Sequence, residues 1–370
     1  MRFGVIGWGL RGGLAGLAHR PEEGFEVVAL ADPNPEKHER FRKRFGENVA
    51  CTTDYCELLT MGLDGIFVLS PDWLHEEQAV ACLEAGVPVY LEKPMAITVE
   101  GCDRILETAK RTGTKLYVGH NMRHFGVVRQ MKEWIDQGLI GEVKTAWCRH
   151  FVSYGGDAYF RDWHAEQEKT TGLLLQKGAH DIDVLHWLCG GYARRVTAMG
   201  KLMVYGKIQD RQSAPGEIEV AFRGVWPPDN LDKLNPVVDV EDVNMVLMEL
   251  DNGVLASYEH CMFSPDAWRN YTVIGTKGRI ENFGDSPGSL IRCWNRYHGG
   301  YSETADLEVR APESSGGHGG ADEKTVGEFL RYLREGGETD TSPVAARMAV
   351  AAGVAATESL RNGSAARDVR

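Results

Sequence analysis

The first 121 residues alternate short apolar segments with helical patterns, and this rhythm limits the possible folds more than any other feature. The segment FGVIG at 3–7 is typical of a buried strand, and a glycine-rich turn and a helix to about residue 19 follow it. Further strands are expected at 25–32, 64–70, 87–93 and 115–121. Strands that alternate with helices form a parallel sheet covered by helices. The sequence therefore begins with an α/β domain.

The turn after the first strand, GVIGWGLRGG, contains the pattern G-x-G-x-x-G. Its glycines allow the backbone to approach a pyrophosphate at a helix N-terminus. Asp32 ends the next strand, at the distance expected for an acid that binds the ribose hydroxyls and repels a 2′-phosphate. NAD is therefore favoured over NADP. The alternative is a glycine turn of another α/β fold, since the chain has 43 glycines. The residues assigned to the cofactor here are Gly7, Trp8, Gly9, Leu10, Gly12 and Asp32.

After residue 121 the pattern changes to long alternating runs with hairpin turns, such as DNG at 251–253. Consecutive strands joined by hairpins predict a mostly antiparallel sheet. We expect an NAD-binding domain at 1–121 and an α+β domain at 122–370, built on an open sheet. A helix is predicted at 173–189. The predicted strand runs cover 217–226, 243–263, 270–283 and 288–297.

The composition excludes several classes of protein. A net charge of −12 argues against nucleic acid or an anionic membrane as a partner, because both require a basic face. The eight cysteines form neither a CxxC pair nor a zinc-type spacing, so no metal site is expected and the thiols are read as reduced. No apolar stretch reaches the length of a bilayer span, and the N-terminus has no signal segment. These features predict a cytoplasmic protein.

Several motifs occur together along nearly the whole chain: GVIGWG, SPDWLH at 70–75, LEKPMA at 91–96, NMR at 121–123 and G-x-H-x-x-D at 178–183. In this combination the chain resembles the Gfo/Idh/MocA oxidoreductase family. That resemblance implies a Rossmann domain followed by an open, largely antiparallel sheet that covers the nicotinamide. The motifs are specific for the family and not for a substrate.

The resemblance assigns the chemistry to Lys93 and His180. Lys93 matches the family lysine that binds the nicotinamide ribose and the reacting hydroxyl. A partly desolvated lysine beside a bound cation has a lowered pKa and can relay a proton. His180 matches the histidine that takes or gives the hydroxyl proton, and imidazole titrates near working pH. Glu92 would orient Lys93, and Pro94 would follow a cis peptide. The alternatives are a surface Glu-Lys pair and a structural histidine.

Other positions match family contacts of two kinds. Further cofactor contacts are implied for Ser70, Pro71, His75 and Asn121. Substrate contacts are implied for Arg123, Tyr154, Trp163, His164, Gln176, Lys177 and His180. Arg123 could instead pair with an acid, Trp163 could belong to the core, and His75 could be a surface residue at a helix N-terminus. Asp181 is expected to cap its helix, and Asp183 to hold a neighbouring group.

The chain departs from many polyol dehydrogenases of the family, which have an aspartate where Gln176 stands. Lys177 beside it would suit an anionic group, or it could face solvent or a nearby acid. The first hypothesis is an NAD-dependent oxidoreductase that transfers a hydride to or from a sugar, sugar acid or glycoside hydroxyl. The alternative is an NAD⁺-dependent glycoside hydrolase that uses transient oxidation, elimination, hydration and re-reduction, with a sulfoquinovoside as one candidate. A non-catalytic NAD-dependent sensor is the third. The broad sheet favours a homodimer or homotetramer.

Overall fold

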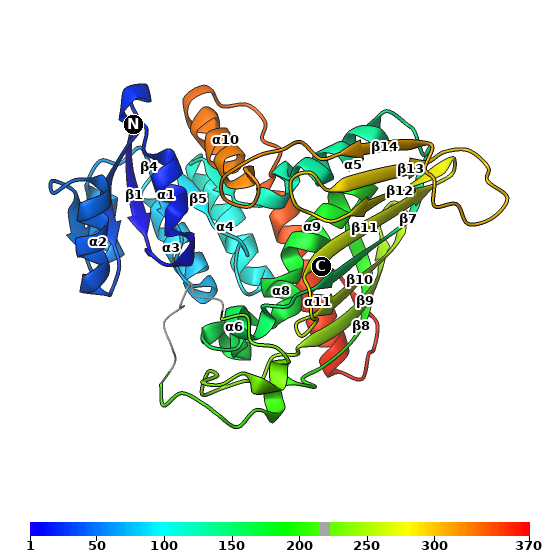
Figure 1. Ribbon diagram of the computed structural model, residues 1–370. Coiled ribbons are helices and arrows are strands. Elements are labelled where there is room, and N and C mark those ends of the chain that lie inside the picture. The colour runs from blue at the N-terminus through cyan, green and yellow to red at the C-terminus, as the bar shows by residue number, and fades with distance from the viewer. Residues whose placement is uncertain (215–222) are drawn as a thin grey trace. The chain divides into compact units, whose positions relative to one another are not determined.

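The computed structural model describes residues 1–214 and 223–370 (Figure 1). The chain forms two compact units. The first contains Met1–Asn121 and Asp322–Val350, and the second contains Met122–Ala321 and Ala351–Arg370. The chain therefore returns to its first unit near the end. The two-range division at residue 121 did not anticipate this return.

The first unit is built on a six-stranded parallel sheet with the strand order β3-β2-β1-β4-β5-β6, which confirms the predicted α/β domain. Its strands are short and largely buried because helices cover both faces of such a sheet. The strands are β1 (Arg2–Ile6), β2 (Glu26–Ala31), β3 (Ala50–Thr52), β4 (Gly65–Val68), β5 (Val89–Leu91) and β6 (Leu116–Val118). The main helices are α1 (Gly13–Ala18), α2 (Pro35–Phe45), α3 (His75–Glu84) and α4 (Val99–Thr112).

Helix α10 (Ala321–Glu335) explains why the chain returns to this unit. Its apolar side chains at Val326, Phe329 and Leu330 are buried in one core with Phe3 and Phe67 of the parallel sheet. The Phe329 ring lies edge-on to the Phe67 ring, with 5.3 Å between the ring centroids. Burying such side chains stabilises the unit by roughly 1.5–3 kcal/mol each. Helix α11 (Pro343–Arg361) follows and leads into the second unit.

The second unit contains a nine-stranded sheet with the order β14-β13-β12-β11-β7-β10-β9-β8-β15. Neighbouring strands are antiparallel apart from the parallel pair β7 and β10, so the predicted mostly antiparallel sheet is confirmed. The predicted turn at 251–253 joins β9 to β10. The predicted strand at 217–226 falls largely on 215–222, outside the described residues. The strands are β7 (Val143–Phe151), β8 (Ala193–Lys201), β9 (Val243–Leu250), β10 (Leu255–Cys261), β11 (Trp268–Gly275), β12 (Gly278–Phe283), β13 (Leu290–Trp294), β14 (Leu307–Arg310) and β15 (Arg367–Asp368).

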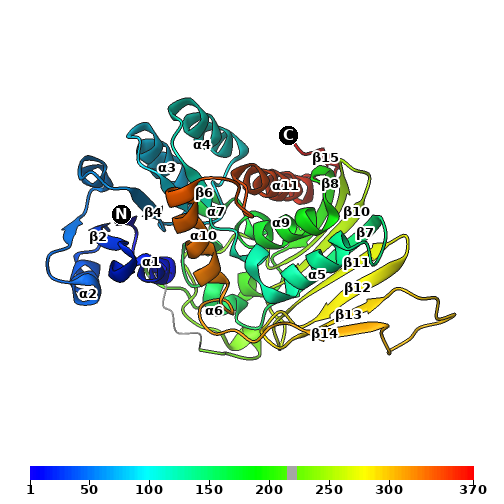
Figure 2. The ribbon, with the colours of Figure 1, turned by 90° about the horizontal axis from the view of Figure 1, so that it is seen from above.

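Helices α5 and α9 lie against one face of this sheet (Figure 2). The predicted helix at 173–189 is divided at Lys177 into two helices. On β9 and β10 buried and exposed side chains alternate, as one covered face and one open face require. The helices of this unit are α5 (Gly126–Asp136), α6 (Gly155–Tyr159), α7 (Gln167–Thr170), α8 (Leu173–Gln176) and α9 (Gly178–Cys189). In the described part of the chain, no helix is both long and apolar enough to cross a membrane.

Candidate active site

Five predicted cofactor residues follow five different strands of the parallel sheet. Gly7 comes after β1, Asp32 after β2, Ser70 after β4, Glu92 after β5 and Asn121 follows β6. The carboxyl ends of parallel strands meet at one edge of a sheet, which is where such folds bind nucleotides. The structure therefore brings these five residues to one edge of the first unit.

The glycine-rich turn leaves room for a ligand. Gly7 has φ +84°, and a Cβ at this position would lie 2.8 Å from the Cα of Ser70, so a larger residue is excluded. A Cβ at Gly9 would meet no described atom within 4 Å. The backbone at Gly9 is thus open on its outer side, as a pyrophosphate contact requires.

Asp32 is held firmly at the end of β2. Its carboxylate is 3% exposed and accepts hydrogen bonds from the backbone N–H groups of Trp8, at 2.7 Å, and Asn34, at 2.9 Å. The Nζ atom of Lys37 lies 3.3 Å from Oδ2, a contact that the sequence did not reveal. This preorganised acid fits the ribose of an adenine dinucleotide.

The E-K-P segment begins directly after β5. The Lys93–Pro94 peptide is cis, as predicted. Glu92 is 4% exposed, and its Oε2 accepts the backbone N–H of Lys93 at 2.6 Å. Its Oε1 accepts Nε–H of Arg11 at 2.7 Å. Glu92 therefore orients the backbone of Lys93, while Arg11 orients Glu92.

His75 and Asn121 complete the edge. The ring of His75 lies between two backbone carbonyls, with Nδ1 2.7 Å from the oxygen of Pro94 and Nε2 2.9 Å from that of Ser70. This ring ties the E-K-P turn to the end of β4, and its contact with a cofactor stays a prediction. The side-chain N–H of Asn121 donates to Asp322 at 2.8 Å. The buried Oδ1 of Asn121 has no partner among the described residues, so it offers an acceptor to the carboxamide or ribose of a nicotinamide nucleotide.

In the second unit the start of α9 carries the predicted proton-transfer residue. His180 is 9% exposed and lies in the first turn of the helix. Gln176 is buried at the end of α8. Lys177 stands between the two helices, with Nζ 5.6 Å from the ring centroid of Tyr159, in the range of a cation–π interaction.

Asp181 does not cap its helix as predicted. Its carboxylate is fully buried and accepts hydrogen bonds from side chains on three strands of the sheet. The donors are His150 Nδ1 at 2.9 Å, Tyr258 at 3.0 Å, Tyr271 at 2.5 Å and Arg269 Nε at 3.0 Å. We call these five side chains the Asp181 cluster. Burial alone would raise the pKa of Asp181, but its ionic and hydrogen-bonded partners hold the pKa well below its ordinary value. The cluster fixes the first turn of α9, and with it His180, on the sheet.

The Asp181 cluster also determines the protonation state and the tautomer of His150. Burial lowers the pKa of His150 to about 4, so this ring is neutral at pH 7. A neutral ring carries one N–H, and Nδ1 must hold it because ionised Asp181 can only accept. His260 stacks on His150 with 5.5 Å between the centroids, and its pKa also lies well below the ordinary value because it is buried.

The remaining predicted substrate residues have partners within the unit. Arg123 forms two hydrogen bonds of 2.7 Å with Asp183, so the anticipated pairing with an acid is present. Trp163 and His164 stack on each other at 3.7 Å. The sugar-contact role stays a prediction for these three residues and for Tyr154, which is partly buried.

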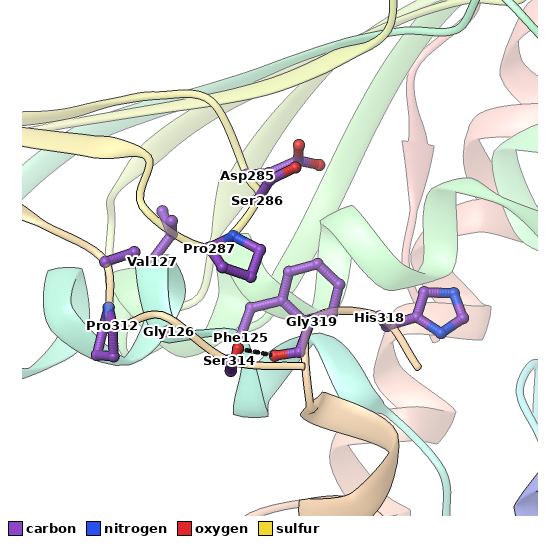
Figure 3. A pocket seen from close by; sticks show the side chains of 11 residues that line it. Phe125, Gly126, Val127, Asp285, Ser286, Pro287, Pro312, Ser314, His318 and Gly319 are labelled. Atoms are coloured by element: carbon purple, nitrogen blue, oxygen red, sulfur yellow. Dashed lines mark hydrogen bonds between the residues drawn. The ribbon is translucent and has the colours of Figure 1, made fainter. Parts of the chain in front are cut away.

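Two hollows in the second unit lie apart from these residues. A cavity of about 10 Å³, enough for one water molecule, is lined by Phe125, Asp285 and Pro287 among others (Figure 3). The rings of Phe125 and His318 lie near each other there, with 6.4 Å between their centroids. An open hollow of about 770 Å³ lies between residues 203–210 and 228–232. Neither hollow is lined by a predicted site residue, so the candidate site is assigned to the carboxyl ends of the parallel strands.

Sequence reasoning assigned no site role to Arg11, to Asp322 or to most of the Asp181 cluster. A signal for the cluster existed in the strand pattern. His150, Tyr258 and Tyr271 stand at inward-facing positions of strands whose other inward side chains are mainly apolar. Polar residues at core positions of a strand require partners. Arg11 had no comparable signal, since both its partners are distant in sequence.

Comparisons with known proteins agree with this arrangement. The NAD-binding Rossmann-fold model of the Gfo/Idh/MocA oxidoreductases matches residues 1–120, and the C-terminal α/β-domain model matches 132–367. Inositol 2-dehydrogenase 1 of Saccharopolyspora erythraea is 32% identical over 209 residues, which are 53% of this chain and 57% of that protein. The 2,7-anhydro-N-acetylneuraminate hydratase of Mediterraneibacter gnavus is 30% identical over 203 residues, 54% of this chain and 52% of the hydratase. Both alignments thus span about half of those relatives.

The fold also matches a solved structure. The structure of levoglucosan dehydrogenase in complex with NADH and levoglucosan covers 100% of this chain and 99% of its own, with a TM-score of 0.80. The identity is 21%, so this likeness concerns the fold.

Proposed function

This chain belongs to the Gfo/Idh/MocA oxidoreductase family, and on that premise we propose that it transfers a hydride between NAD and a hydroxyl group of a sugar, sugar acid or glycoside. The bound nicotinamide supplies the hydride acceptor or donor. One observation carries the proposal. The open glycine turn, Asp32, the E-K-P segment and the orphaned acceptor of Asn121 all lie at one edge of the parallel sheet.

We assign the proton chemistry to one residue of each unit. Lys93 would hydrogen-bond the reacting oxygen and stabilise the charge that develops on it. His180 would take or give the hydroxyl proton. The firm placement of both groups supports these roles. Glu92 holds the backbone of Lys93, and the Asp181 cluster holds the helical turn of His180.

The test is a substrate panel with the purified protein. Neutral sugars, polyols, acidic sugars and aryl glycosides are incubated with NAD⁺, and both NADH absorbance and released aglycone are followed. Accumulation of NADH with a sugar or polyol supports the oxidoreductase. Binding of NAD without turnover of any compound would point to the sensor and contradict the proposal.

We also propose that NAD(H) binds more tightly than NADP(H). Asp32 follows β2 at the position expected to bind the ribose hydroxyls, where its carboxylate would repel a 2′-phosphate. It accepts hydrogen bonds from the backbone N–H groups of Trp8 and Asn34. Lys37, 3.3 Å from the carboxylate, softens this repulsion. Titration with NADH and NADPH decides the point, and tighter binding of NADPH would overturn the role of Asp32.

The redox-neutral glycoside hydrolase remains the second candidate because position 176 carries glutamine and position 177 lysine. The partial similarity to a hydratase of an anhydro sugar acid favours the same class of chemistry. In the panel experiment, this enzyme would release aglycone without net formation of NADH.

Lys177 offers a separate test of an anionic substrate. Lys177→Met should raise KM for an acidic sugar about 10- to 150-fold, since a charge-assisted hydrogen bond contributes about 1.5–3 kcal/mol. The neutral analogue serves as the control. Equal changes for both substrates would mean that Lys177 only shapes the site.

We further propose a homodimer or homotetramer formed through the open face of the nine-stranded sheet. Met199, Met245, Leu247 and Leu255 are 56–66% exposed on neighbouring strands of this face. Light scattering would show the state, and Leu247→Glu should dissociate it. The eight cysteines are free thiols, which fits the reducing cytoplasm that we propose for this protein.

A further inference from the structure

Arg11 lies inside the glycine-rich turn, where an arginine would ordinarily be assigned to a phosphate. In this chain its guanidinium faces two carboxylates instead. Nε donates to Glu92 at 2.7 Å, while Nη1 and Nη2 donate to the two oxygens of Asp322 at 3.0 and 2.9 Å. The side chains of Glu92 and Asp322 are 5% and 7% exposed. All three nitrogens of the fork are therefore bound to acids.

This group of charges joins four segments that are distant in sequence. Arg11 belongs to the glycine turn, Glu92 to the E-K-P segment and Asp322 to the first turn of α10. Asn121, after β6, donates to the same oxygen of Asp322 that accepts Nη2 of Arg11. The second oxygen of Glu92 accepts the N–H of Lys93. The cofactor turn and the proposed reacting lysine are thus connected through one arginine and one glutamate.

The chemistry of this group requires arginine. Burial alone would lower the pKa of Arg11, but Glu92 and Asp322 more than reverse this effect, so the cation is permanent. A planar fork can bind one carboxylate through two nitrogens and a second through its third, whereas a lysine is a single point charge. Removal of the guanidinium would leave two buried carboxylates near each other without a cation.

We propose that Arg11 and Asp322 are positioning residues of the NAD site. Together they fix Glu92 and Asn121 relative to the glycine turn, and Glu92 in turn fixes the backbone of Lys93. This role also explains why the chain returns to its first unit at Asp322. The part that concerns Lys93 rests on the proposed function. The part that concerns the cofactor depends only on the NAD-binding domain.

The experiment compares Arg11→Met, Arg11→Lys and Asp322→Asn with a matched control, Arg347→Met. Arg347 binds Asp103 through two hydrogen bonds of 2.8 and 3.0 Å in the same unit, and neither residue belongs to the site. The full-length protein is titrated with NADH by fluorescence between pH 5 and 8, and thermal unfolding is recorded for each variant.

Arg11 binds carboxylates and not the cofactor, so its effect on NADH is indirect. Arg11→Met should raise the Kd for NADH about tenfold, the size expected if the displaced site loses one hydrogen bond to the cofactor. It should also make the Kd depend on pH, because a buried carboxylate without its cation titrates nearer neutrality. Arg11→Lys and Asp322→Asn should give intermediate values. Arg347→Met should lower the thermal midpoint and leave the Kd within about twofold.

Where a sugar substrate is turned over, Arg11→Met should also lower kcat by about 10²-fold, since misplacement of a reacting group has effects of this size. Equal Kd values and equal pH profiles for the Arg11 and Arg347 variants would overturn the proposal. The same holds if Arg11→Lys and Asp322→Asn fold but bind NADH like the wild type. Failure of the proposed function alone would appear differently, as a changed Kd without turnover of any sugar.

Discussion

The first unit gathers its buried charges around a cation and the second around an anion. Arg11 is shared by Glu92, which follows β5, and Asp322, in the first turn of α10, so the group lies at the edge of the sheet. Asp181 is shared by four donors that come from the interiors of strands, so that cluster lies within the core. A charged group at a sheet edge is accessible to a ligand, whereas a charged group within a core contributes first to the stability of the fold. We therefore expect changes to the residues at the sheet edge of the first unit to affect chemistry, and changes to the Asp181 cluster to affect stability.

The largest expected effect is a loss of turnover without a loss of cofactor binding in the first unit. Lys93→Ala should lower turnover by about 10²–10⁴-fold, the usual contribution of a general acid–base group. NADH should still bind, because the glycine turn and Asp32 hold most of the cofactor. Steady-state kinetics and an NADH titration would show this, with the thermal midpoint as a control. Activity near the wild-type level would remove the E-K-P assignment.

The corresponding change in the second unit should act on stability. Asp181→Asn should lower the free energy of unfolding by about 3–5 kcal/mol, because Arg269 and His150 lose a buried charged partner. Urea unfolding measures it. The paired variant Asp181→Leu with Arg269→Met should lose less, since no buried charge is then left alone at that contact. An Asp181→Asn protein as stable as the wild type would mean that the cluster contributes little to the fold.

Acid should destabilise the second unit before the first. Burial lowers the pKa values of His150 and His186 to about 4, below the ordinary 6.5 of a histidine in the unfolded chain. Between pH 6.5 and 4 the unfolded state therefore binds more protons. Stability falls as the pH falls through this window, by about 1.4 kcal/mol per pH unit for each histidine. The permanent charge of Arg11 adds no such slope.

Hydrogen exchange at pH 7, 5.5 and 4.5, resolved by peptide, would locate this loss. Faster exchange in peptides of β7 and α9 than in those of β1 and β4 is expected. A His186→Gln variant should show a shallower decline. An equal acceleration of exchange in both units would contradict the earlier loss of stability expected for the second unit.

The smallest effect concerns the backbone before α8. Thr171 has φ +64° and ψ −42°, a conformation that is strained for a β-branched residue. Thr171→Gly should stabilise the protein by about 1 kcal/mol. Relief of the backbone strain stabilises the fold, and the larger conformational entropy that glycine loses on folding offsets part of this gain. Thr170→Gly is the matched control. Thr170 is buried and donates to the carbonyl of Glu166 at 2.9 Å, so its removal should destabilise. Equal changes for the two variants would contradict the strain at Thr171.

Much of the first unit could be predicted because its signals are local. An apolar strand, a glycine turn and an acid at the next strand end lie within the first 32 residues, and the parallel sheet brings successive strand ends together by geometry. The hairpins of the second sheet were equally local, since DNG sits between two alternating runs. The cis bond before Pro94 followed from the E-K-P resemblance.

The sequence by itself thus determined the order of elements, the nucleotide turn, Asp32 and the presence of Lys93 and His180. Only the tertiary structure decided which charges meet. Arg11 and Asp322 are 311 positions apart, and Asp181 and Arg269 are 88 apart. Nothing in a linear pattern distinguishes these pairs from the other combinations of 41 basic and 53 acidic residues. A charge gains its partner only when burial removes water as the competing ligand, and burial is a property of the packed chain.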